Sequence, residues 1–153
     1  MPLKKEAPPA PRVKKAPASR MTLAEAMSAL EKAGSAQTRK TYARHGAAEP
    51  MFGVSFAVLK TLRKRIGVDH DLGIALWGTG NFDARNLAVK VVDPYRMSPA
   101  DLDRWARDPN IRMCVGYVAH LAAESQHGRA RAEAWLEASS EGFAVFLTKS
   151  LSL

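Results

Sequence analysis

The chain has 153 residues, of which 46% are hydrophobic and 25% charged, so it is long enough for one soluble domain with a substantial core. Its net charge of +8 favours a densely negative partner, most obviously nucleic acid, although a basic surface can also serve solubility alone. The single cysteine, Cys114, excludes an internal disulfide and a cysteine-rich zinc site and indicates a reducing compartment. Because there is no apolar signal segment and no apolar run that could span a bilayer, we expect a cytoplasmic protein without membrane contact.

Residues 1–20 differ in composition from the rest of the chain. They hold five of the nine prolines, and six basic residues against one glutamate give them a net charge of +5. Proline removes backbone donors and little in this stretch can be buried, so we expect a disordered basic tail. Such a tail either holds phosphates loosely or is passive. Residues 21–153 are predicted to form a single helical-repeat domain.

The first two helices are predicted from the signals at their ends. Thr22 followed by Glu25 is the pattern of a capping box, and Gly34 ends the helix that it begins. A second helix is predicted over residues 36–45. The segment 47–53 contains a proline and a glycine and is predicted to be a loop.

The third predicted helix, residues 55–66, carries a dense cluster of positive charge. Ser55 caps it and Gly67 ends it. The apolar stripe predicted to be buried consists of Phe56, Leu59, Leu62 and Ile66. Outside that stripe lie Lys60, Arg63 and Lys64.

The next two helices are short and close together. Asp69 caps the fourth helix, which contains Trp77 and ends in the turn at residues 78–80. The fifth helix opens at Asn81 or Phe82 and closes before Pro94. Its predicted inward side chains are Ala84, Leu87, Ala88 and Val91, and its predicted outward ones are Arg85, Asn86 and Lys90.

Three further helices are predicted after residue 97. Ser98 with Pro99 begins one that stops near Pro109, Asn110 caps another through about residue 123, and a third follows Gly128. The tryptophans at 77, 105 and 135 sit at apolar helical positions and are predicted to pack in the core. Residues 141–153 are compatible with a final helix or an extended tail. Their apolar side chains predict that this end packs back, supports self-association, or is followed by more chain.

About eight helices with short links, and no alternating strand pattern, predict an all-α protein. The helices pair as hairpins roughly 30–40 residues apart, the spacing of a HEAT-like α-solenoid of about four helical hairpins. A compact helical bundle is the alternative.

A set of short motifs between residues 45 and 105 occurs in an order typical of one family. They are His45-Gly46, Phe52-Gly53-Val54, Leu62-Arg63, Ile66-Gly67, Leu76-Trp77, Phe82-Asp83-Ala84-Arg85, Leu87-Ala88 and Trp105. In this order they resemble the DNA alkylation repair (AlkD-like) family of HEAT-like DNA glycosylases. The resemblance implies a basic concave surface that holds duplex DNA and hydrolytic excision of alkylated purines such as 3-methyladenine or 7-methylguanine. It implies no cofactor and no metal, because a cationic base is a good leaving group and a carboxylate near the sugar stabilises the developing cation.

The sequence departs from this family where the catalytic acid is expected. Active members have an Asn-Trp-Asp-x-x-Asp-like run whose last aspartate is catalytic, and here residues 110–115 read Asn-Ile-Arg-Met-Cys-Val. Val115 therefore occupies the acid position, and no catalytic residue is carried over by the resemblance. Tyr117, His120 and Glu124 share one helix face, which makes Glu124 a weak candidate for a substitute acid, against the simpler prediction of a surface helix end.

The candidate DNA contacts are the basic side chains of the matched helices. They are Lys60, Arg63, Lys64, Arg85 and Lys90. Phosphate binding requires only positive charge on one continuous face, and the alternatives are a solvated helix face or, for Arg85, an ion pair with Asp83 or a neighbouring helix. Two functions remain open: an excising DNA repair protein, or a non-catalytic module that binds DNA or another protein.

Overall fold

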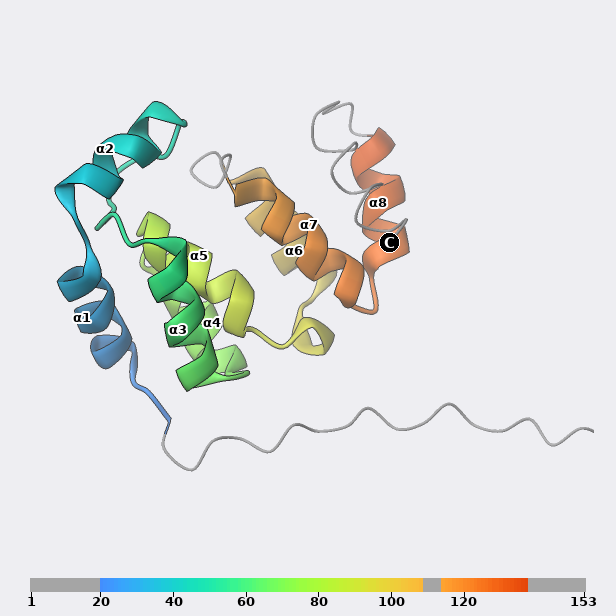
Figure 1. The fold of residues 1–153 in the computed structure, drawn as a ribbon. Coiled ribbons are helices and arrows are strands. Elements are labelled where there is room, and N and C mark those ends of the chain that lie inside the picture. The colour runs from blue at the N-terminus through green and yellow to red at the C-terminus, as the bar shows by residue number, and fades with distance from the viewer. Residues whose placement is uncertain (1–19, 109–113, 138–153) are drawn as a thin grey trace, which may run out of the picture.

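The computed structural model describes residues 20–108 and 114–137, and these form a stack of short helices (Figure 1). The α-helices are α1 (Leu23–Ala33), α2 (Ala36–Arg44), α3 (Phe56–Ile66), α4 (His70–Gly78), α5 (Phe82–Val91), α6 (Pro99–Arg107), α7 (Val115–Glu124) and α8 (Gly128–Glu137). A 3-10 turn, η1 (Pro94–Arg96), joins α5 to α6. The described ranges contain no strand, so the predicted all-α class is confirmed. The predicted tail up to residue 19, the cap at Asn110 and the apolar end at 141–153 lie outside the described residues.

The helix ends follow the capping signals of the sequence. Thr22 forms a complete capping box with Glu25, and the side chains of Ser55, Asp69 and Asn81 each accept a hydrogen bond from a backbone N–H in the first turn of their helix. These residues define the starts of α1, α3, α4 and α5, so short-range chemistry determines where those helices begin.

The helices succeed one another from α1 and α2 at one end to α8 at the other (Figure 1). The hairpin of α4 and α5 forms the centre, with α1 and α3 packed on one side and α7 on the other, followed by α6 and α8. At Gly73 of α4 an added Cβ would lie 2.3 Å from the Val92 side chain, so only glycine permits this close approach. The arrangement agrees with the predicted HEAT-like array of hairpins.

The three tryptophans are core residues, as predicted. Trp77 and Trp105 stack with their ring centroids 4.0 Å apart and only 5° between the ring planes. Trp135 is also buried, and its indole N–H donates to Asp103 at 2.6 Å, linking α8 to α6. The tryptophans therefore join consecutive layers of the array.

One buried carboxylate ties the loop before α3 to the first turn of α5. Asp83 is 0% exposed and accepts hydrogen bonds from the backbone N–H groups of Phe52, Gly53 and Val54 at 2.6, 3.0 and 2.8 Å. Charge-assisted bonds of this kind are stronger than neutral ones, and the helix N-terminus also favours the negative charge. Asp83 thus fixes the point from which α3 starts.

Two side chains differ from the sequence prediction. Phe56 was expected in the buried stripe of α3 but is 40% exposed, because it begins the helix at the edge of a groove that faces α7. Asn86 was expected to point outward but is 0% exposed, because α5 is enclosed by α3, α4 and α7. Periodicity alone places a residue on a helix face but does not show how many neighbours that helix has.

Candidate nucleic-acid interface

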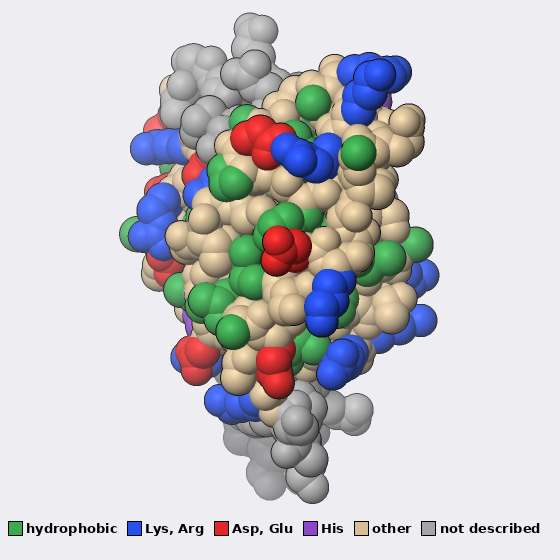
Figure 2. Space-filling model, turned by 90° about the vertical axis from the view of Figure 1, so that its left-hand side faces the viewer, with side chains coloured by type: hydrophobic (Ala, Val, Ile, Leu, Met, Phe, Trp, Pro, Cys, Tyr) green, Lys and Arg blue, Asp and Glu red, His purple; other side chains and the backbone are tan. Residues whose placement is uncertain are grey.

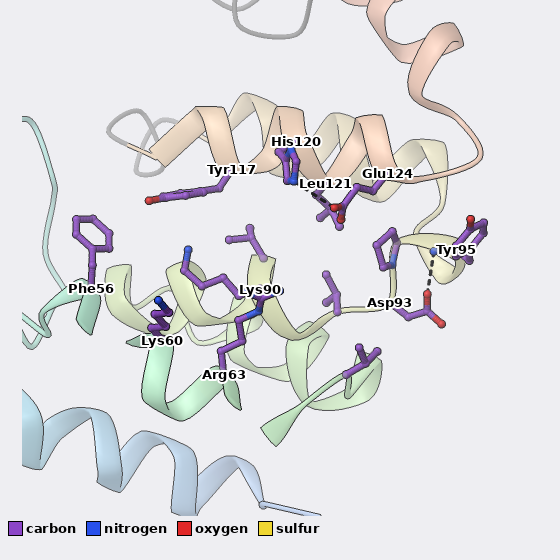
Figure 3. A pocket seen from close by; sticks show the side chains of 14 residues that line it. Phe56, Lys60, Arg63, Lys90, Asp93, Tyr95, Tyr117, His120, Leu121 and Glu124 are labelled. Carbon is purple, nitrogen blue, oxygen red and sulfur yellow. Dashed lines mark hydrogen bonds and ion pairs between the residues drawn. The ribbon is translucent and has the colours of Figure 1, made fainter. Parts of the chain in front are cut away.

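A groove of about 960 Å³ opens between α3, α5 and α7 (Figure 3). One wall is α3, the floor is the C-terminal half of α5 with the segment that follows it, and the other wall is α7. The charged and aromatic residues that line it are Phe56, Lys60, Arg63, Lys90, Asp93, Tyr95, Tyr117, His120 and Glu124. The groove thus collects side chains that lie up to 68 residues apart in the sequence, from Phe56 to Glu124.

Three of the predicted DNA contacts meet in this groove. Lys60 and Arg63 are exposed one turn apart on α3, and the half-buried Lys90 rises from the floor toward Tyr117 (Figure 3). The Lys90 Nζ lies 3.7 Å from the centroid of the Tyr117 ring, a cation–π contact. Burial lowers the pKa of Lys90; the Cys114 thiol opposes this shift and the Arg63 guanidinium adds to it. In the described part of the chain, no ion pair joins any of these three cations to a carboxylate.

Lys64 and Arg85 lie elsewhere. Lys64 is exposed on α3 but does not line the groove. The Arg85 side chain is 12% exposed and forms an ion pair at 2.7 Å with Asp108, the C-cap of α6. Its Nε donates to the backbone oxygen of Trp77 at 3.2 Å, and its guanidinium lies 4.9 Å from the centroid of the Trp77 ring. Arg85 therefore pairs with a neighbouring helix, the alternative expected from the sequence, and leaves little of its charge for a phosphate.

The shared face of Tyr117, His120 and Glu124 is present on α7 and forms the upper wall of the groove (Figure 3). The His120 Nε2 lies 3.1 Å from the Glu124 Oε1, and both side chains are more than half exposed. An exposed pair of this kind contributes little to stability. Glu124 thus lines the groove, but one of its carboxylate oxygens is paired with His120.

The position that the resemblance assigns to the catalytic acid lies at the start of α7. Val115 is the first residue of that helix and Cys114 is its N-cap. Burial raises the pKa of the Cys114 thiol to about 11, so the sulfur is neutral and unreactive at ordinary pH. Neither residue provides a charged group for catalysis.

Sequence reasoning placed Tyr117 on the candidate face of α7 but missed the exposed rings of Phe56 and Tyr95. Phe56 and Tyr117 are each 40% exposed with ring centroids 6.4 Å apart, and Tyr95 is 58% exposed. Large exposed rings beside cations are typical of surfaces that bind nucleic acid. Nothing in the spacing of Phe56 distinguishes it from its buried neighbours on α3, so no sequence signal was available for it.

The end face formed by α1 and α2 contrasts with the groove. Figure 2 shows basic side chains there among acidic and apolar ones, and the exposed residues include Glu25, Glu31, Lys32, Arg39 and Lys40. Arg39 also pairs with Glu49. Lys32 and Lys40 also form no ion pair among the described residues, so the groove differs from this end because its cations converge in one hollow beside exposed aromatic rings.

Two further findings concern only the residues that the structure describes. They contain no group of three or more His, Cys, Asp or Glu side chains placed to hold a metal ion. None of their helices is long and apolar enough to cross a membrane.

The stacked helices and the basic groove define a helical-repeat protein of the HEAT-like type, the class found among DNA glycosylases. The family model described as DNA alkylation repair enzyme matches residues 26–141, and the chain belongs to that family. Its fold is also similar to a solved structure described as a new family of proteins related to the HEAT-like repeat DNA glycosylases with affinity for branched DNA structures.

That structural match has a TM-score of 0.72 and 32% sequence identity. It covers 85% of this chain but 54% of the other, so the chain spans about half the length of the related protein. A search of curated proteins found no match.

Proposed function

We propose that the protein binds DNA in the groove between α3, α5 and α7, without excising bases. Lys60 and Arg63 contact phosphates of the backbone, Lys90 faces the bound DNA from the groove floor, and Lys64 adds positive charge beside the groove. The observation that carries the proposal is the convergence of these three groove cations, from two helices, without carboxylate partners in the described residues. Membership of the DNA alkylation repair family and the affinity for branched DNA of the related structure support DNA as the partner.

The binding proposal predicts a steep dependence on salt and on the groove cations. Fluorescence anisotropy with a linear duplex and a four-way junction should show affinity falling with salt, with a log–log slope of about −0.9 per phosphate contact. The double variant Lys60→Glu, Arg63→Glu should weaken binding by roughly tenfold or more and flatten that slope.

The double variant Lys32→Glu, Lys40→Glu is the matched control, since these exposed lysines belong to α1 and α2 and do not line the groove. It should change the affinity by less than about twofold. Equal losses of affinity in the two variants would show that DNA binding depends only on the net charge of the protein. Comparing the two DNA forms also tests whether the affinity of the related protein for branched DNA extends to this chain.

Base excision is the second candidate, and the place of Glu124 in the groove is the observation in its favour. Because Val115 occupies the acid position and His120 pairs with Glu124, we expect no release of 3-methyladenine or 7-methylguanine from methylated duplex above a heat-treated control. Chromatography of released bases measures this. Release that disappears in Glu124→Gln would instead establish the enzyme and identify its acid.

A further inference from the structure

We infer that Lys90 is a nucleophile for an aldehyde, and that the groove accepts an abasic deoxyribose, the DNA sugar left when a base is lost. In its open-chain form this sugar carries an aldehyde at C1′, and the Lys90 amine forms an imine with it. The inference rests on the proposed function, because the groove must first bind DNA. The inference extends the proposed function to abasic DNA as a ligand and to imine formation as a reaction, and neither requires a carboxylate at position 115.

The position of Lys90 is unusual for a lysine. Its side chain is half-buried on the groove floor, and within the described residues it has no carboxylate partner. A lysine withdrawn from water is normally paired, because desolvating the ammonium is costly. The Tyr117 ring at 3.7 Å offsets only part of that cost. An unpaired, half-buried amine that faces an open groove is therefore a candidate for a reactive group, because it has no carboxylate partner through which it could stabilise the fold.

The half-buried position of Lys90 favours the neutral amine, because desolvation disfavours the ammonium. Lys60, Arg63 and His120 line the same groove, and of its acidic residues Glu124 is paired with His120 while Asp93 accepts the backbone N–H of Tyr95 at 2.9 Å. Burial lowers the pKa of Lys90 below the ordinary 10.5 of lysine; Cys114 opposes this shift and Arg63 adds to it. Desolvation and a neighbouring cation are the two conditions that make lysine a Schiff-base nucleophile in enzymes.

The aromatic rings explain why the aldehyde should come from an abasic site. Loss of a base leaves a gap in the stack, and a flat apolar ring can occupy it. The Tyr117 ring lies over the Lys90 Nζ (Figure 3). The centroids of the Tyr117 and Phe56 rings are 6.4 Å apart, and both residues are 40% exposed. A ring that fills the gap would bring C1′ of the baseless sugar near the amine, while Lys60 and Arg63 hold the flanking phosphates.

The reaction is a condensation that needs no oxidant or metal. The lone pair of the neutral Lys90 nitrogen forms a bond to C1′, and the carbonyl oxygen takes up a proton to give a carbinolamine. Loss of the hydroxyl as water, with the remaining proton from nitrogen, forms the C1′=N double bond. One aldehyde and one amine thus become one imine and one water. Hydride from cyanoborohydride added at C1′, with a proton from water added at nitrogen, converts the imine to a stable secondary amine.

Reductive trapping tests the inference on the full-length protein. A labelled duplex with one abasic site is incubated with protein and sodium cyanoborohydride at protein concentrations that saturate the DNA, set for each variant by its own binding curve. We expect a covalent complex on a denaturing gel, and none with the intact duplex. Lys90→Arg should lower the yield by roughly tenfold or more, whereas Lys32→Arg, the same change at an exposed lysine outside the groove, should keep it within about twofold.

Mass spectrometry of the digested complex locates the adduct, because the α-amino group and the lysines of residues 1–20 are competing amines. An adduct at Lys90 supports the inference if its rate of formation rises with pH and levels off below pH 10.5, the ordinary pKa of lysine. An adduct confined to other amines, or an unchanged yield in Lys90→Arg, overturns it. If the protein binds DNA but forms no adduct, the imine inference is overturned and the proposed function stands. If it neither binds DNA nor forms an adduct, the proposed function is overturned as well.

Discussion

Asp83 illustrates at the scale of one residue how the candidate interface is held in place. It lies away from the groove, yet its carboxylate carries the three hydrogen bonds that position the loop before α3. The resemblance in the sequence included this residue as part of a motif, but its neighbours gave no indication that its partners lie about 30 residues earlier. A long-range hydrogen bond leaves no periodic signal in a sequence.

Removing the charge of Asp83 should therefore destabilise the protein. Asp83→Asn replaces one acceptor with an amide group facing buried N–H donors, and we expect the free energy of unfolding to fall by about 2–3 kcal/mol. Urea unfolding followed by circular dichroism measures the loss. The control is Asp71→Asn, whose exposed ion pair with Arg96 at 3.2 Å should contribute within about 1 kcal/mol. Similar losses in both variants would contradict the role assigned to Asp83.

At the scale of elements, the loop between α2 and α3 determines where one wall of the groove lies. Gly53 has φ +78°, and an added Cβ would lie 2.6 Å from the backbone nitrogen of Arg39 and from the backbone oxygen of Ser35. Helix starts in this region were predictable, because caps depend on adjacent residues. The path of the loop was not, because it depends on contacts with α2 and α5.

Gly53→Ala should disturb this loop more than a glycine substitution elsewhere. Backbone strain and the clash with fixed backbone atoms should together lower the free energy of unfolding by more than about 2 kcal/mol. Gly80→Ala is the matched control, since Gly80 has φ +74° but nothing within 4 Å of an added Cβ. Strain alone should cost about 1 kcal/mol there. Thermal unfolding compares the two, and an equal shift would show that crowding at Gly53 is unimportant.

At the scale of the whole molecule, the class of fold was accessible from the sequence and the groove was not. Helix periodicity, caps and short links predict a stack of helical hairpins. They do not show that Lys90 faces Tyr117 or that Arg85 turns toward Asp108, because both depend on how α5 packs between other helices. Self-association through residues 141–153 stays a prediction, and light scattering on the purified protein would measure it.

The positive charge of the chain is divided between its first 20 residues and the rest of the sequence, so the effects of net charge and of position can be separated. Changing Lys4, Lys5, Lys14 and Lys15 to glutamine removes four charges, the same change as in Lys60→Glu, Arg63→Glu. If the groove is the interface, the groove variant should lose roughly tenfold or more in DNA affinity and the tail variant clearly less. Anisotropy titrations at two salt concentrations make the comparison. Equal losses would indicate that the protein attracts DNA through its overall charge.

The hydrogen bonds of Asp83 have a consequence for binding as well as for stability. Asp83 belongs to α5, the helix that also carries Lys90, and it holds the loop from which α3 presents Lys60 and Arg63. The separation between cations on the two helices is therefore set by bonds inside the protein before any DNA arrives. A site whose charges are already spaced loses little conformational freedom when it binds. For the same reason, a substitution that touches no nucleic acid can change which phosphate spacing the protein accepts.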